Sequence, residues 1–319
     1  MQGYKYHITK SINFLEDLMK QLSSKQADIM LFFVAFFWGT GFTVTKIGLE
    51  VFTTMQLLSI RFIIATIVSF ILFHKNMKKT TKQDIKAGII MGIFLALGYV
   101  FQTVGLEGTT AGNSAFLTGT NVVMVPFFYY LVSKKKPGLN NTVAAGLMFI
   151  GIILLTVDFN NFGKFNFSDM LTFLCAISFA WQIVVTGIYA SDKDPYVIST
   201  IQMTTSAVIF SVMMFFDKTP LTINLKGVVS MAYLSVVTTM LCFLMQTVAQ
   251  KYTQTSHAAI LLSLESVVGS IFGIIFLGEK YTFVMLFAFA SIFLSILIAE
   301  CDLASLFKNR KFKKIYQNN

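Results

Sequence analysis

One carboxylate stands inside a long apolar stretch of the chain, where it could do chemistry. The run "SHAAILLSLESVVGSIFGIIFLGEK" holds Glu265 among apolar and small residues. If residues 254–277 cross a membrane as one helix, Glu265 lies 11 residues from one end and 12 from the other, near the bilayer midplane. Holding a charge there costs roughly 2.5 to 3.5 kcal/mol. We therefore expect a protonated or paired carboxylate that faces a cavity.

Two interpretations of Glu265 are open at this point. In the first, the carboxylate takes part in proton coupling or binds an amine of a substrate. In the second, it is a neutral carboxylic acid that is hydrogen-bonded to another helix and has a structural role.

Two cations also fall inside apolar runs, each toward one end of its run. Lys46 can extend its stem to the headgroups, which is the simple account of a lysine at this depth. Arg61 lies six residues into its run, so we expect a buried partner or an anionic group of a substrate beside it.

Aromatic and amide side chains complete the polar inventory of the apolar runs. Trp38 and Trp181 lie too deep for interfacial belts, and each could line a cavity or pack in the core. The amides Gln102, Gln182 and Gln246 could serve equally as hydrogen-bonding contacts between helices or as donors to a substrate.

Composition indicates what must position these residues. The chain has 319 residues, 55% of them hydrophobic and 13% charged, which is typical of a polytopic membrane protein. Ten apolar runs have the length of spanning helices and none alternates as a membrane strand would, so we expect an all-α protein with ten transmembrane helices. The expected spans are 29–48, 55–73, 85–106, 112–133, 142–157, 169–190, 197–216, 227–250, 254–277 and 281–299.

The basic residues predict the orientation of these spans. With an even number of spans, 19 Lys and Arg residues fall on the side of both termini and 4 on the other side. Cytoplasmic segments carry such an excess, so both termini are expected in the cytoplasm. The net charge of +10 is then loop charge that sets orientation, and it gives no reason to expect a nucleic-acid partner.

The terminal segments differ from the membrane region. Residues 1–27 lack an uninterrupted apolar core, so no cleavable signal peptide is expected. Their apolar residues have helical spacing, which suits either a helix lying on the cytoplasmic leaflet or a partly ordered tail. Residues 300–319 form a basic cytoplasmic tail.

An internal repeat relates the two halves of the chain. "QTVGLEGTTAGNSAFLTGTNVVMVPFF" aligns without gaps to "QTVAQKYTQTSHAAILLSLESVVGSIF" at an offset of 144, with eight of 27 positions identical. Asn121 is then the partner of Glu265, and Trp38 meets Trp181 at an offset of 143. Five spans in each repeat place the second copy upside down, a plan common among secondary transporters. The candidate substrate- or proton-binding residues are Glu265, Asn121, Trp38, Trp181, Gln182, Arg61, Gln102 and Gln246.

Three stretches resemble the EamA-type branch of the drug/metabolite transporter superfamily: "FFWGTGFTVTKIGL", "GLEGTTAGNSAFLTGTNVVMVPFF" and "LLSLESVVGSIFGIIFLGEKYT". The resemblance implies two inverted five-helix repeats, here 28–157 and 168–299, and export or exchange of small metabolites across the inner membrane. Two departures stand out. Ser266 occupies a position where the family commonly has Pro, and "SKKKPG" lacks a common acidic residue. Pro126 predicts a kink in the first repeat.

Other functional classes find less support. No motif of a soluble enzyme is present, and a single midplane carboxylate does not make an intramembrane active site. Rings of charges typical of a channel are not evident. We expect a bacterial inner-membrane secondary transporter, acting as a monomer or homodimer without a cofactor, that exports amino acids or related metabolites with possible proton coupling. A nucleotide-sugar or drug-type exchanger, or a sensor or scaffold that does not transport, stays open.

Overall fold

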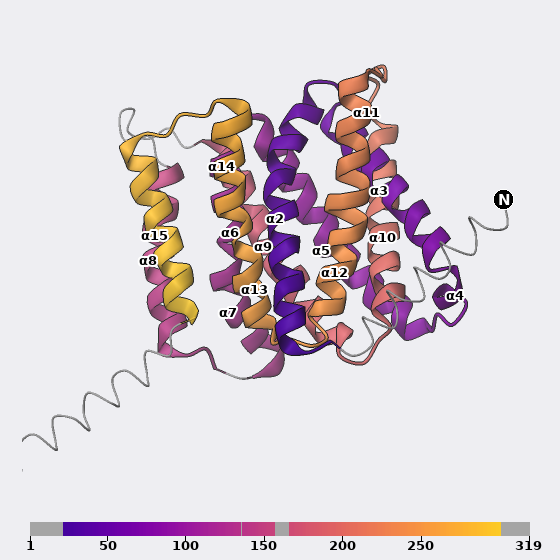
Figure 1. Cartoon of the computed structure of the whole chain (residues 1–319), viewed down its shortest axis with the longest axis horizontal. Coiled ribbons are helices and arrows are strands. Elements are labelled where there is room, and N and C mark those ends of the chain that lie inside the picture. The colour runs from indigo at the N-terminus through magenta and orange to yellow at the C-terminus, as the bar shows by residue number, and fades with distance from the viewer. Residues whose placement is uncertain (1–21, 135, 157–165, 301–319) are drawn as a thin grey trace, which may run out of the picture.

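The computed structural model describes residues 22–134, 136–156 and 166–300, and these ranges contain helices and no strand (Figure 1). The expected amphipathic helix at the N-terminus and the basic tail lie outside the described residues. The elements are α2 (Ser24–Leu49), α3 (Thr54–Leu72), α4 (His74–Met77), α5 (Lys82–Glu107), α6 (Ala111–Gly119), α7 (Asn121–Ser133), α8 (Leu139–Thr156), α9 (Phe167–Ala190), α10 (Pro195–Phe215), α11 (Leu225–Ala232), the π-helix η1 (Tyr233–Leu241), α12 (Cys242–Ala249), α13 (Thr255–Ser263), α14 (Glu265–Leu277) and α15 (Phe283–Glu300).

Side-chain caps define where several long helices begin. Ser23, Thr53 and Thr81 each accept a hydrogen bond from the backbone N–H three residues later, and the side chain at that later position accepts one from the cap residue. These reciprocal bonds satisfy N–H groups that a helix start leaves free. The boundaries therefore follow from local sequence as well as from hydropathy.

Within the described ranges, eight helical segments are long and apolar enough to cross a membrane. The expectation of an all-helical, multi-pass membrane protein is confirmed to that extent. The other two expected spans correspond to α8 and α15, whose apolar stretches are shorter, at residues 142–151 and 283–295. These two helices pack against each other at one edge of the bundle (Figure 1).

Two of the expected spans are broken in the middle. The first is interrupted at Thr120, between α6 and α7, and the second at Leu264, between α13 and α14. Each break is a single turn with hydrogen bonds between residues three apart, and the two breaks are 144 residues apart, as the repeat predicts. Pro126, where a kink is expected, lies inside α7, which continues through that residue. Ser266 in place of Pro does not prevent the second break.

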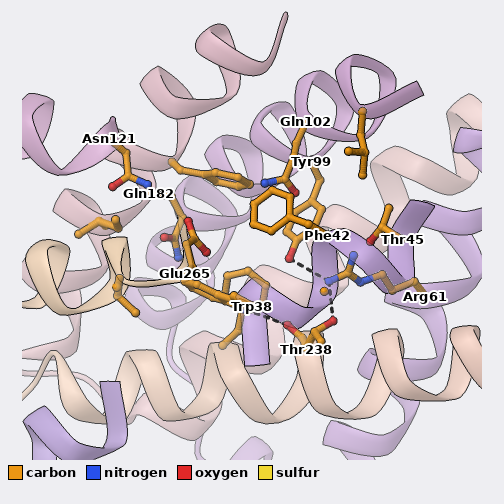
Figure 2. Close-up of a pocket in the computed structure, with 16 residues that line it drawn as sticks. Trp38, Phe42, Thr45, Arg61, Tyr99, Gln102, Asn121, Gln182, Thr238 and Glu265 are labelled. Atoms are coloured by element: carbon orange, nitrogen blue, oxygen red, sulfur yellow. Dashed lines mark hydrogen bonds between the residues drawn. The ribbon is translucent and has the colours of Figure 1, made fainter. Parts of the chain in front are cut away.

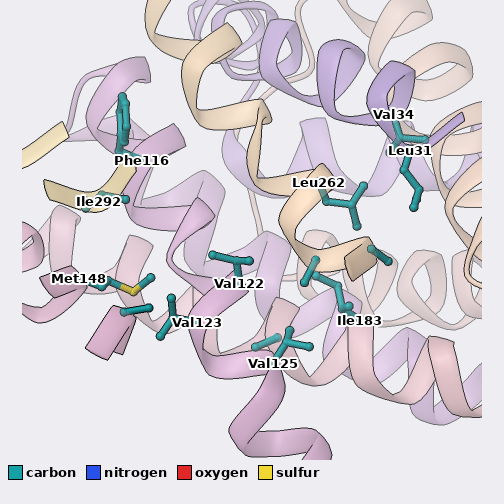
Figure 3. Close-up of a cluster of buried hydrophobic side chains, with 14 of the residues drawn as sticks. Leu31, Val34, Phe116, Val122, Val123, Val125, Met148, Ile183, Leu262 and Ile292 are labelled. Carbon is teal, nitrogen blue, oxygen red and sulfur yellow. The ribbon is translucent and has the colours of Figure 1, made fainter. Parts of the chain in front are cut away.

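Apolar side chains fill two large clusters inside the bundle. One lies among α2, α6, α7, α9 and α13 and reaches α8 and α15 (Figure 3). The other lies among α3, α5, α10 and α12. The outer faces are apolar too: Phe283 is 83% exposed and Phe149 is 63% exposed. A surface of that kind is suited to lipid.

Small residues let helices of the two halves approach closely. A Cβ on Gly39 of α2 would lie 2.5 Å from the Cβ of Val268 and 2.8 Å from the carbonyl oxygen of Glu265, both on α14. A Cβ on Gly269 of α14 would lie 2.6 Å from the Cβ of Ala115 on α6. Backbone of the second half thus packs directly against the first half at the level of the break.

The connections between helices gather at two ends of the bundle. We call one the Glu279 end; it holds residues 50–53, 108–110, 216–224 and 278–282 (Figure 1). We call the other the Asp28 end; it holds residues 22–23, 73–81, 191–194 and 250–254. Both helix breaks lie between these ends.

Candidate substrate site

A pocket lies at the level of the helix breaks, between the two halves of the chain (Figure 2). Its empty volume, including space open to solvent, is about 590 Å³. The first half contributes α2, α3, α5 and α7, and the second half contributes α9, η1, α12, α13 and α14. The lining residues are Trp38, Gly41, Phe42, Thr45, Arg61, Tyr99, Gln102, Leu106, Asn121, Phe179, Gln182, Ile183, Thr238, Phe243, Leu262 and Glu265.

Three pairs of lining residues are related by the repeat offset of 144. They are Trp38 with Gln182, Tyr99 with Phe243, and Asn121 with Glu265. The offset of 143 that matched the two tryptophans is therefore not the one that builds the pocket. Equivalent backbone positions face one space from both halves, and they carry different side chains.

Arg61 is the cation of this pocket, and it is 3% exposed. Its Nη2 donates to the Tyr99 hydroxyl at 3.0 Å and to Thr238 Oγ1 at 2.9 Å, while its Nε donates to Thr239 Oγ1. The guanidinium carbon lies 4.6 Å from the centre of the Tyr99 ring. Among the described residues, no carboxylate pairs with Arg61.

The π-helix η1 explains how two adjacent threonines reach one guanidinium. Thr238 and Thr239 both donate their own hydroxyl hydrogen to the carbonyl of Leu234, four and five residues earlier. The wider turn of a π-helix brings these consecutive positions to the same face. The carbonyl of Thr238 also accepts the indole N–H of Trp38 at 2.9 Å. This segment of the second half thus fixes Arg61 and Trp38 of the first.

Glu265 and Asn121, the first residues after the two breaks, are 5% and 3% exposed. Among the described residues, the Glu265 carboxylate has neither a hydrogen bond nor an ion pair, and Asn121 Oδ1 has no hydrogen-bond partner. Buried polar groups ordinarily have partners. Figure 2 shows Glu265 and Arg61 on opposite sides of the aromatic group formed by Phe42 and Tyr99. Both charges are therefore available to a molecule in the pocket.

The predicted glutamines divide between the pocket and the packing around it. Gln102 lines the pocket and donates to Thr118 Oγ1 at 3.3 Å. Gln182 also lines it and exchanges hydrogen bonds of 3.2 and 3.1 Å with Gln246, which is not a lining residue. Gln246 therefore lies outside the pocket and holds the amide of Gln182 in position.

Trp181 takes the second of the two roles left open for it, packing in the core, and Lys46 is bound where α5 ends. Trp181 does not line the pocket, because its ring is stacked between Phe94 and Phe128, at centroid distances of 5.8 and 4.8 Å. The stem of Lys46 extends toward the Glu279 end. Its ammonium donates to the carbonyls of Leu106 and Thr109, where α5 ends.

Sequence reasoning missed the aromatic and hydroxyl residues of the pocket. Tyr99, Phe179, Phe243 and Thr238 are ordinary members of apolar runs. One signal could have found two of them: Tyr99 and Phe243 stand three residues before Gln102 and Gln246, at the same offset of 144. Among the described residues, no group of three His, Cys, Asp or Glu side chains is placed to hold a metal ion.

The fold and the pocket define a polytopic membrane protein with a polar site enclosed by two related halves. Residues 25–157 and 166–300 each match the EamA-like transporter family. An uncharacterized transporter from Archaeoglobus fulgidus is 32% identical over 274 residues, which are 86% of this chain and 85% of the relative. The chain belongs to the EamA-like transporter family, and it is a membrane transporter. Family and relative point to transport rather than to enzymatic activity.

A solved crystal structure of a protein has the same fold. It is 13% identical in sequence and superposes with a TM-score of 0.67, covering 86% of this chain and 96% of that chain. At that identity the likeness concerns the fold alone.

Proposed function

We propose that this protein is a secondary transporter of small polar metabolites, amino acids or related compounds, which it exports or exchanges by alternating access. The observation that carries the proposal is the pocket at the helix breaks, where Glu265 and Arg61 lie buried and have no partner of opposite charge among the described residues. Unpaired buried charges are costly, and a ligand of complementary charge removes that cost. A zwitterion carries both complements.

The topology in this proposal has ten membrane helices, with α8 and α15 as the fifth of each repeat. Repeats 28–157 and 168–299 have opposite orientation and rock about the pocket to open either face. The pairs of lining residues at one offset support such a pseudo-symmetric site. The protein lies in the inner membrane of a bacterial cell with both termini in the cytoplasm, as the 19 to 4 division of basic residues favours.

Glu265 has the coupling role in this mechanism. It directly follows a helix break, so a change in the angle between α13 and α14 moves it relative to the lining residues of the first half. We infer that the carboxylate loses a proton, or pairs with a substrate ammonium, in one state and is protonated in the other. The alternative is a transporter of the same fold that exchanges nucleotide sugars or drugs without a proton.

The experiment is uptake into inverted membrane vesicles of labelled amino acids, amines and nucleobases. Vesicles with the wild-type protein are compared with vesicles that lack it and with vesicles of Glu265→Gln. Uptake of a panel member that needs the protein and falls in the variant supports the proposal. Uptake that is equal with and without the protein for every compound contradicts it and favours a sensor or scaffold.

A further inference from the structure

The geometry points to Arg61 as the residue that determines substrate specificity, by binding a single carboxylate group of the substrate. This inference rests on the proposed transport function and names the chemistry of its substrate.

The guanidinium of Arg61 is held by three elements in one orientation. Arg61 itself comes from α3, Tyr99 from α5, and the two threonines from η1. Its partners are neutral oxygen atoms, so the positive charge is oriented and not neutralised. An arginine has five N–H donors, and the described bonds use those of Nε and Nη2. Nη1, with two N–H groups, forms no bond with the described residues. A preoriented guanidinium with free donors suits a planar carboxylate.

The charge balance of the pocket favours a substrate with a single negatively charged group. Arg61 is the single cation among the lining residues, and Glu265 is the single acid. A carboxylate neutralises Arg61 and leaves Glu265 to a proton or an ammonium group. The diphosphate of a nucleotide sugar carries at least two negative charges, so one of them would stay unpaired beside Glu265 in a buried space. The charges of the lining residues therefore argue against nucleotide sugars as the substrate class.

The experiment compares ligands that differ only at the carboxylate. The thermal stability of the purified full-length protein is measured with L-leucine and L-leucinamide, with L-phenylalanine and L-phenylalaninamide, and with UDP-glucose. We expect the acids to raise the melting temperature and the amides and UDP-glucose not to. Arg61→Gln should lower the apparent affinity for the acid about tenfold or more, since charge-assisted hydrogen bonds are lost.

Two further variants separate recognition from folding. Arg61→Lys keeps the charge and should retain part of the effect of the acid, whereas Lys218→Gln removes an exposed cation away from the pocket and should leave it unchanged. Equal stabilisation by acid and amide, stabilisation by UDP-glucose, survival of the discrimination in Arg61→Gln, or no stabilisation by any compound would overturn the inference. Vesicle uptake without discrimination between acid and amide leaves the transporter proposal standing and removes only this one. If the thermal-stability assay discriminates between acid and amide but the vesicles take up neither, this inference stands and the transporter proposal is removed.

A separate set of contacts, at the Glu279 end, carries a second inference. The Glu279 carboxylate, in the connection after α14, accepts the backbone N–H groups of Ala111 and Gly112, at the start of α6. The Tyr281 hydroxyl lies 3.0 Å from Glu279 Oε2 and 3.2 Å from the carbonyl of Ser270. Burial, and then the charge of Glu279, raise the pKa of Tyr281, so its hydroxyl stays a donor through the physiological range. An anion at a helix start is favoured by the helix dipole.

Within the part of the chain that the structure describes, the equivalent place in the other repeat shows no such arrangement. The N-cap of α13, Gln254, makes no side-chain cap hydrogen bond, whereas Thr110 caps α6. The residue 144 positions before Glu279 is Lys135, which is outside the described residues and whose ammonium cannot accept an N–H. We infer that Glu279 is a latch that holds the two repeats together at its own end and favours the state in which that end is closed.

Hydrogen exchange of the full-length protein tests the latch. We expect Glu279→Ala to raise the exchange of the Ala111 and Gly112 amides about tenfold, and Glu279→Gln to raise it less because one acceptor oxygen remains. Lys280→Ala should not change it. Unchanged exchange in Glu279→Ala would contradict the inference, and so would an equal rise at the start of α13, which would indicate general destabilisation. The result does not depend on whether a substrate is known.

Discussion

The pairs α6/α7 and α13/α14 share one backbone plan and differ in chemistry. Each pair has a helix of 9 residues, a one-residue break and a helix of 13 residues. Each ends on a left-handed residue, Lys134 with φ of 60° and Gly278 with φ of 65°. The residue after the break is an amide in one and a carboxylate in the other. The shared backbone builds a symmetric frame, and the substitutions give the two halves different tasks.

The two ends of the bundle also differ in the contacts that join the two halves. At the Glu279 end, a carboxylate binds backbone N–H groups of the other half. At the Asp28 end, Asp28 of α2 lies 3.4 Å from His257 Nε2 and 3.2 Å from Thr253 Oγ1. Asp28 and His257 are 30% and 40% exposed in their side chains, and their contact is ionic only when the histidine is protonated. Partly exposed pairs of that kind contribute little to stability. The two ends are therefore tied with unequal strength.

The two residues that follow the helix breaks give the strongest test of the difference between the repeats. We expect Glu265→Ala to lower substrate counterflow in proteoliposomes by a factor that corresponds to about 2–5 kcal/mol, the usual effect of truncating a buried charge that binds its partner. Asn121→Ala, the matched control, should cost about 1 kcal/mol, because a neutral hydrogen bond is lost. Similar losses in both variants would mean that the carboxylate has no special task.

A second test concerns the close approach of α2 to α14. The repeat equivalent of Gly39 is Ile183, so this tight contact belongs to one half only. Gly39→Ala should destabilise the protein by about 1–3 kcal/mol through overpacking, as measured by thermal unfolding in detergent. A Cβ on Gly146 meets nothing within 4 Å, so Gly146→Ala should be neutral or slightly stabilising. A neutral Gly39→Ala would show that the halves pack less tightly than described.

Substitution of the two tryptophans gives a matched comparison with a smaller expected effect on substrate binding. Trp38→Phe removes the indole N–H that Thr238 accepts and should weaken substrate binding about fivefold, which corresponds to about 1 kcal/mol. Trp181→Phe keeps an aromatic ring in the stack outside the pocket and should leave binding unchanged. Titration of the transported substrate against each variant measures both. A larger effect at Trp181 would reverse the assignment.

The smallest expected effect is at Asp217, in the connection after α10. The Thr53 hydroxyl, and then the N–H of Thr219, lower the pKa of this carboxyl from its usual value. A lowered folded-state pKa adds stability above the unfolded value near about 3.9, and this stability is lost as the pH falls through the folded value. Asp217→Asn should therefore lower the melting temperature slightly at pH 7 and by less at pH 3. A difference that grows toward acid pH would contradict this sign.

Sequence reasoning was strongest where a long-range pattern repeats. Hydropathy alone indicates the helices, and the offset of 144 alone pairs Asn121 with Glu265. The same pattern gave the wrong repeat partner for Trp38. Apolar sequence matches at offsets of both 143 and 144, so Trp38 was paired with Trp181 although Gln182 is its equivalent in the pocket. No proline stands at Thr120 or Leu264 to mark a helix break. The repeat therefore relates the two break positions to each other, but it does not predict that the helices break there. Arg61 finds its partners through a π-helix, whose wider turn depends on tertiary packing that local propensity does not encode.

The central claim is that Glu265 couples substrate movement to protons in a pocket shared by both repeats. The most direct measurement is the lumenal pH of proteoliposomes when a transported substrate is added, in the wild type and in Glu265→Gln reconstituted at equal density. The account predicts a substrate-dependent pH change in the wild type and none in the variant. The same pH change in both proteins would contradict it and leave Glu265 with a structural role.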